Sequence, residues 1–95
     1  MDRLPTRVER SGPDWQRRSE HNLALAADLK ERLAAVKEGG GGKYVERHRS
    51  RNKMLPRERI AEICDPGSPF LELSSLAANG LYDGKAHSAG IITGI

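Results

Sequence analysis

The chain has 95 residues and a formal net charge of +3, with 37% hydrophobic, 4% aromatic and 31% charged residues. This length allows one small domain at most, and so few apolar residues leave little material for a core. No run approaches the roughly 18–20 apolar residues of a membrane span, and the N-terminus has no apolar region typical of a signal peptide. The single cysteine, Cys64, cannot form an internal disulfide, which indicates a reducing compartment. We expect a bacterial cytoplasm.

The first element expected is a long helix over residues 14–38. Residues 1–13 have no periodicity and contain two prolines, which predicts a disordered tail. The apolar residues of the helix recur at steps of four, four and three: Leu25, Leu29, Leu33 and Val36. Glycines 39–42 end the helix as a Gly-rich turn. Because its apolar seam is narrow, we expect this helix to pack either on its own domain or on another subunit.

Two short helices are expected between residues 43 and 64. The first covers Tyr44–Arg51, and Asn52 follows at a position where the left-handed backbone conformation is expected. The second has Pro56 in its first turn, where a missing N–H is harmless. One face of this second helix carries Ile60, Ile63 and Cys64.

The remaining residues, 65–95, are expected to form a turn, a loop and the first one or two strands of a sheet. "DPGS" is a turn signature, and the "PFLEL" that follows it predicts a short strand. After a loop rich in Gly, Asn and Asp, "GIITGI" at Gly90–Ile95 predicts a buried strand because it is β-branched. The chain stops within that strand, so we expect it to be the front piece of a longer protein with an incomplete domain over 14–95.

Motifs for catalysis or metal binding are missing from this sequence. "GGGGK" lacks the first glycine of a phosphate-binding loop, and Tyr44 stands where that loop has Ser or Thr. His21, His48 and His87 are far apart. Cys64 has no cysteine neighbour, so we expect no metal site and interpret this thiol as a small core residue. No serine is matched with a base, and no catalytic residue is named.

The basic segment Lys43–Ile60 is the strongest remaining feature. It carries a net charge of +5, which leaves −2 for the rest of the chain. Such an asymmetry indicates an anionic partner or an acidic neighbouring surface. One interpretation is a charged surface in which Arg57 and Arg59 pair with nearby acids. The acids available for that pairing are Glu46, Glu58 and Glu62.

Two functional interpretations of the basic segment stay open on the residues alone. A small basic nucleic-acid-binding or ribosome-associated protein needs aromatic side chains that stack on bases, and only Tyr44 lies nearby. Alternatively, Arg47, Arg51 and Lys53 converge on the phosphate groups of a small anion, with the two arginines one helical turn apart.

The order of motifs from residue 20 to 95 resembles the N-terminal part of the carboxyltransferase (beta) subunit of biotin-dependent acyl-CoA carboxylases. The resemblance is to the methylcrotonyl type above all, and it is carried by the glycine run, "LPRERI", "DPGSPFLELS", a glycine–tyrosine loop and "AGIITGI". The matching basic positions include His48, Arg51 and Lys53. Asn52 departs from the pattern, because the family usually has glycine there. Asparagine tolerates the same left-handed turn.

This resemblance implies a crotonase/ClpP-like α/β fold, of which the chain holds the N-terminal helices and the first strands. It implies carboxyl transfer from carboxybiotin to an acyl-CoA such as 3-methylcrotonyl-CoA. The implied partners are a biotin carboxylase and biotin carrier subunit and further copies of the full-length subunit, with no nucleic acid and no membrane. Under this reading Arg47, Arg51 and Lys53 contact the CoA phosphates. The oxyanion-hole regions of the family lie downstream of the match, so we expect the 95 residues to be inactive alone and to bind no cofactor themselves.

Overall fold

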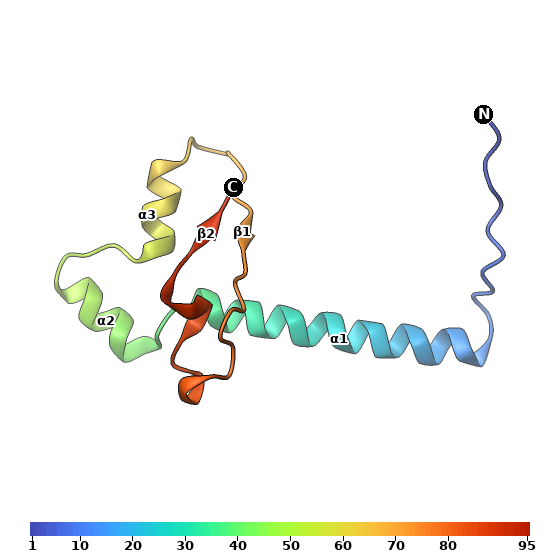
Figure 1. The fold of residues 1–95 in the computed structure, drawn as a ribbon, viewed down its shortest axis with the longest axis horizontal. Coiled ribbons are helices and arrows are strands. Elements are labelled where there is room, and N and C mark those ends of the chain that lie inside the picture. Colours follow the sequence, from blue (N-terminus) through green and yellow to red (C-terminus); the bar gives the residue numbers. More distant parts are fainter. The chain divides into compact units, whose positions relative to one another are not determined.

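A computed structural model describes residues 1–95. The chain divides into two compact units, Met1–Lys30 and Glu31–Ile95, and the boundary between them lies within the first helix. This helix, α1, covers Pro13–Lys37 (Figure 1), against the expected 14–38. Asp14 in its first turn and Lys37 in its last turn both complement the helix dipole. No helix of the chain combines the length and the apolar character needed to cross a bilayer.

The first unit exposes nearly all of its side chains. Residues 1–9 have no regular secondary structure. The guanidinium of Arg10 lies 5.8 Å from the centroid of the Trp15 ring, a cation–π distance. Leu25 and Leu29, from the apolar seam of α1, are 54% and 48% exposed. The half of the seam that belongs to this unit is therefore not covered within the unit.

The second unit begins with the last turns of α1 and continues through two short helices. Gly39 and Gly41 take φ angles of +79° and +93°, which only glycine adopts readily, and so end α1 and start the next helix. The helix α2 covers Gly42–Ser50 and α3 covers Pro56–Ile63. The proline lies at the first helical position of α3, where its fixed φ suits the helix and where an N–H would have no partner within the helix.

Two short strands, β1 (Glu72–Leu73) and β2 (Thr93–Gly94), pair antiparallel and lie side by side in Figure 1. Glu72 faces Gly94 and Leu73 faces Thr93 in the register. Leu71 and Ile95 extend the ladder with two mutual N–H···O bonds of 2.8 and 3.0 Å. No pair of elements other than these strands makes extensive contacts.

The expectation of a buried strand over Gly90–Ile95 is wrong for this chain. Only Thr93–Gly94 forms a strand, and Ile91 and Ile95 are 67% and 81% exposed. β-branched side chains are buried only where a second layer packs on the sheet, and no helix makes extensive contacts with these strands.

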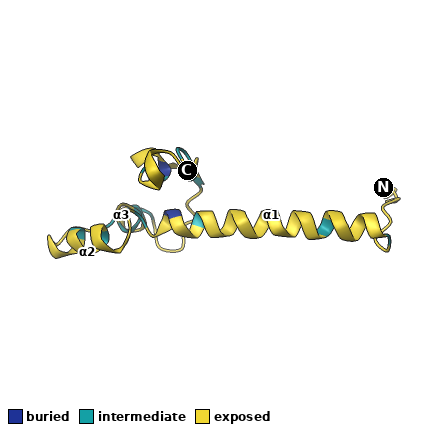
Figure 2. Cartoon of the chain, turned by 90° about the horizontal axis from the view of Figure 1, so that it is seen from below, coloured by how far each residue is buried: buried dark blue, intermediate teal, exposed yellow.

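The core is correspondingly small. Val36, near the end of α1, is the one buried hydrophobic residue, and Ser88 is the one buried polar residue. Figure 2 shows exposed surface along most of the chain. On the apolar face of α3, Ile60 and Cys64 are half-buried but Ile63 is 84% exposed. Burial therefore gathers where the end of α1, the start of α3 and β1 meet.

Candidate functional site

The basic segment folds into a tight corner between α2 and α3. At this corner Asn52 takes φ +56°, and its N–H donates to the carbonyl of Arg49 at 2.9 Å. The expected left-handed conformation of Asn52 is confirmed. Nε2 of His48 lies 2.8 Å from the carbonyl oxygen of Met54, so the imidazole donates across the turn. These two bonds fix the path of the chain between the helices.

Glu58, on α3, stabilises the same corner through two contacts. Its Oε2 accepts the backbone N–H of Leu55 at 2.8 Å, which caps the start of α3, and its Oε1 pairs with Arg49 at 2.5 Å. The hydrogen bond from Leu55 is the main cause that lowers the pKa of Glu58. Partial desolvation acts in the opposite direction, and the positive charge of Arg49 lowers the pKa further. The carboxylate therefore joins the two helices.

The three residues expected to contact an anion all lie at this corner. Arg47 is on α2 and Arg51 caps its C-terminus, so they share one side of the helix, while Lys53 lies past the turn. All three are exposed, and their side chains make no ion pair or hydrogen bond within the chain. The negative end of the α2 dipole stabilises cations there. The corner therefore presents unneutralised positive charge to solvent.

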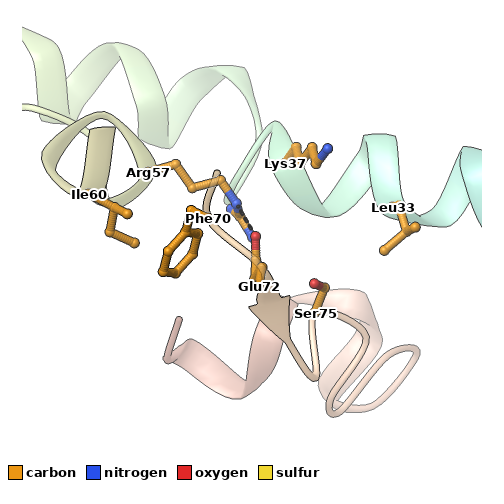
Figure 3. A pocket seen from close by; sticks show the side chains of 7 residues that line it. All are labelled: Leu33, Lys37, Arg57, Ile60, Phe70, Glu72 and Ser75. Atoms are coloured by element: carbon orange, nitrogen blue, oxygen red, sulfur yellow. Dashed lines mark hydrogen bonds and ion pairs between the residues drawn. The ribbon is translucent and has the colours of Figure 1, made fainter. Parts of the chain in front are cut away.

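Arg57 has a different role from the surface pairing expected for it. Its Nε and Nη2 donate to Oε2 and Oε1 of Glu72 at 3.1 and 2.6 Å, which makes a bidentate ion pair (Figure 3). The expected pairing with Glu46, Glu58 or Glu62 is wrong, because Glu58 is engaged by Arg49 and Leu55. Arg57, one residue earlier on α3, projects about 100° around the helix from Glu58.

Further donors of Arg57 reach two other segments. Nη1 donates to the carbonyl of Val36 at 3.2 Å and Nη2 to Oγ of Ser88 at 3.4 Å. The buried Ser88 hydroxyl donates in turn to the carbonyl of Ser75 at 3.0 Å. The side chains of Arg57 and Glu72 are only 27% and 14% exposed. We call Arg57, Glu72, Ser88 and the Val36 carbonyl the Arg57 cluster.

Glu72 is held ionised by this cluster. The hydrogen bonds from Arg57 are the main cause that lowers its pKa, partial burial opposes them, and the charges of Arg57 and Lys37 contribute in the lowering direction. An open pocket of about 360 Å³ lies beside the pair. Figure 3 shows its lining: Leu33, Lys37, Arg57, Ile60, Phe70, Glu72 and Ser75. Since Arg57 and Glu72 satisfy each other, this pocket offers no free acid–base pair.

The 95 residues bring together no recognisable catalytic constellation. No group of three His, Cys, Asp or Glu side chains lies close enough to hold a metal ion. Cys64 is half-buried and not bonded to another cysteine. The sequence did hold one signal for the Arg57 cluster that our interpretation missed. Glu72 stands between two leucines of "PFLEL", and a carboxylate on a partly buried strand needs a cation partner.

Comparison with known proteins gives consistent matches along the chain, although no protein-family model matches it. The chain is 47% identical over 92 residues to the mitochondrial methylcrotonoyl-CoA carboxylase beta chain of Arabidopsis thaliana, which covers 97% of this chain and 16% of that protein. It is 51% identical over 77 residues to the biotin-dependent 3-methylcrotonyl-coenzyme A carboxylase beta1 subunit of Mycobacterium tuberculosis, 81% of this chain and 15% of that subunit.

A third relative is the probable mitochondrial methylcrotonoyl-CoA carboxylase beta chain of Drosophila melanogaster. The identity is 42% over 93 residues, 97% of this chain and 16% of that protein. The chain therefore spans about one sixth of the length of the curated relatives it matches.

Proposed function

This chain is related to the beta subunits of biotin-dependent acyl-CoA carboxylases, and on that basis we propose that it forms part of a carboxyltransferase subunit. The proposed reaction transfers a carboxyl group from carboxybiotin to an acyl-CoA such as 3-methylcrotonyl-CoA. The observation that carries this proposal is the identity of 42–51%, which extends over 81–97% of the chain.

The rest of the assembly follows from the same relationship. We propose a crotonase-like α/β fold for the whole subunit, with the helices and the β1–β2 pair as one portion of it. The proposed partners are a biotin carboxylase, a biotin carrier and further copies of the subunit. Because the chain spans about one sixth of its relatives and assembles no catalytic constellation, the groups that form the oxyanion holes belong to other parts of the subunit.

For this chain itself, the proposed role is to bind the phosphates of acyl-CoA through Arg47, Arg51 and Lys53. Their exposure and lack of partners support the role, because cations already paired within the chain cannot attract a ligand. The names of the relatives favour CoA over nucleic acid as the anionic ligand. The basic segment also has only Tyr44 as an exposed aromatic for base stacking.

Titration of the chain with CoA at low salt tests this role. We expect Arg51→Glu to weaken binding at least about fivefold, since reversing one phosphate contact removes on the order of 1 kcal/mol or more. Arg7→Glu is the matched control, because Arg7 is exposed, lies in the first unit and undergoes the same charge reversal. Equal affinity of the Arg51→Glu variant and the unaltered chain would contradict the assignment.

Two further measurements separate the alternatives. A gel shift with RNA at two salt concentrations tests the nucleic-acid interpretation, which predicts tight binding that falls steeply with salt. An assay of carboxyl transfer with free biotin and acyl-CoA tests the catalytic assignment. We expect no turnover by the 95 residues alone, and robust turnover would overturn the assignment of the catalytic groups to other parts of the subunit.

A further inference from the structure

We propose that Arg57 is a positioning residue that holds the α2–α3 corner in a fixed place against β1. Through that anchor Arg47, Arg51 and Lys53 are presented to a phosphate-bearing ligand with a defined geometry. The inference rests on the proposed function for the identity of the ligand. The contacts of the anchor itself all lie within the second unit.

Several separate segments of the chain meet at the side chain of Arg57. Arg57 lies in the first turn of α3 and uses three of its nitrogen atoms. They reach Glu72 on β1, the carbonyl of Val36 near the end of α1, and Ser88 in the turn before β2. The hydroxyl of Ser88 donates in turn to the carbonyl of Ser75. Glu58, by comparison, bonds only Leu55 and Arg49.

Two further contacts connect the helix that carries Arg57 to the exposed cations. Glu58, the next residue on α3, ties Leu55 and Arg49 together. His48 and Met54 form the second tie across the corner. A displacement of α3 therefore moves α2 with it, together with the cations on α2 and at the turn.

The anchor requires arginine at position 57. A lysine has one ammonium group and cannot reach both oxygens of Glu72 while donating to two other segments. The loss of Arg57 leaves the Glu72 carboxylate, whose side chain is 14% exposed, without its cation, and it removes a donor to the hydroxyl of Ser88, which is 6% exposed. The corner then separates from β1 to let water reach these groups.

The anchor is tested by attaching a nitroxide to Cys64, the single cysteine, which directly follows α3. Paramagnetic broadening of the backbone amides of β1 and β2 then reports where α3 lies against the sheet. We expect Arg57→Lys to redistribute this broadening. Arg59→Lys should leave it unchanged, because Arg59 is on the same helix but is exposed and makes no side-chain bond. Broadening that is identical in Arg57→Lys and the unaltered chain overturns the inference.

The link to ligand binding is tested by a double-mutant cycle with CoA. We expect Arg57→Lys to weaken CoA binding about fivefold, because a displaced corner no longer brings Arg51 to the phosphates and so loses the contact that Arg51 makes. If Arg57 acts through the corner, adding Arg57→Lys to Arg51→Glu weakens binding by less than it does alone. Fully additive losses overturn a positioning role, since they show that the two residues act independently.

Two outcomes keep the inference distinct from the proposed function. If the unaltered chain does not bind CoA, the proposed ligand is wrong, and the broadening experiment alone decides whether Arg57 anchors the corner. If Arg57→Lys loses its helical circular dichroism, Glu72→Gln takes its place in both experiments. That variant keeps the shape of the side chain and removes its charge. It must show the same redistribution, and unchanged broadening in it overturns the anchor.

Discussion

Gly94 in β2 offers a direct test of how tightly the two strands pair. A methyl group at this position would lie 2.5 Å from the carbonyl oxygen of Leu71 and 2.6 Å from Cε2 of Phe70. Both distances are well under the 3.0 Å below which such contacts essentially never occur. In Gly94→Ala, therefore, either the strand or the ring must move.

The two obstacles differ in how easily they yield. The ring of Phe70 is 38% exposed and can swing outward at the loss of its packing. The Leu71 carbonyl is less free, because it accepts the N–H of Ile95 at 3.0 Å in the ladder. Over-filling of a packed site costs about 1–3 kcal/mol. We therefore expect Gly94→Ala to destabilise the β1–β2 pairing by this amount.

Native-state hydrogen exchange measures the effect at the two amides that close the ladder, those of Leu71 and Ile95. A loss of 1–3 kcal/mol corresponds to exchange about 5- to 150-fold faster for groups that open locally. Gly42→Ala is the control, since a methyl group there meets nothing within 4 Å. In Gly94→Ala combined with Phe70→Leu, the part of the loss caused by the ring should return. Unchanged exchange in Gly94→Ala would refute the register of the strands.

Three further predictions concern the second unit. Asn52→Ala should lower the free energy of unfolding by about 1–2 kcal/mol, because alanine is strained at φ +56°, whereas Asn52→Gly should not lower it. Urea unfolding of the two variants measures the difference, and equal losses would contradict the left-handed corner. Because Val36 is buried, Val36→Ala should lower the free energy of unfolding by roughly 1.5 kcal/mol in the same assay. An unchanged free energy of unfolding would show that the core lies elsewhere. Glu72 has a folded-state pKa below its ordinary value of 4.5, so its contribution is present above that pH and is lost as the pH falls through the folded pKa. Unfolding followed from pH 6 to 3 should show this loss and a flatter profile for Glu72→Gln, and identical profiles would disprove it.

The helices of this chain were predictable because their signals are local. The glycine run after α1, the proline that starts α3 and the asparagine at the corner each act within a few residues. Such signals depend on backbone sterics and terminal hydrogen bonds, which do not need the rest of the fold. The bounds of α1 accordingly differ from those expected by one residue at each end.

The Arg57 cluster was not predictable in the same way. Arg57 and Glu72 are 15 residues apart, and the sequence offered four acids nearer to Arg57: Glu46, Glu58, Glu62 and Asp65. Which acid pairs with which arginine depends on how α3 turns toward β1, and this is a property of packing rather than of spacing. The prediction that Gly90–Ile95 is buried was wrong for a related reason. Apolar residues indicate that a strand needs a second layer packed on it, but they do not show whether that layer is present.

The loop before β2 shows a third limit of sequence patterns. Between Ser74 and Gly90, six residues other than glycine have positive φ: Ser74, Ala78, Tyr82, Asp83, Ser88 and Ala89. Gly, Asn and Asp in this stretch predicted a loop, but they do not predict left-handed alanines, which are disfavoured by roughly 1–2 kcal/mol each. One of the six, Ser88, is a member of the Arg57 cluster, so its conformation is tied to a tertiary contact.

The dense basic segment therefore separates into two groups of cations with different consequences. Arg49 and Arg57 are neutralised by Glu58 and Glu72, whose carboxylates are kept ionised by those same contacts. The other cations of the segment, Lys43, Arg47, Arg51, Lys53 and Arg59, keep their charge for solvent or a ligand. Loss of a paired arginine should change the shape of the corner at any ionic strength. Loss of a free one should change ligand binding chiefly at low salt, because exposed charges are screened over about 10 Å at 0.1 M. Salt dependence thus distinguishes the residues that build this corner from those that use it.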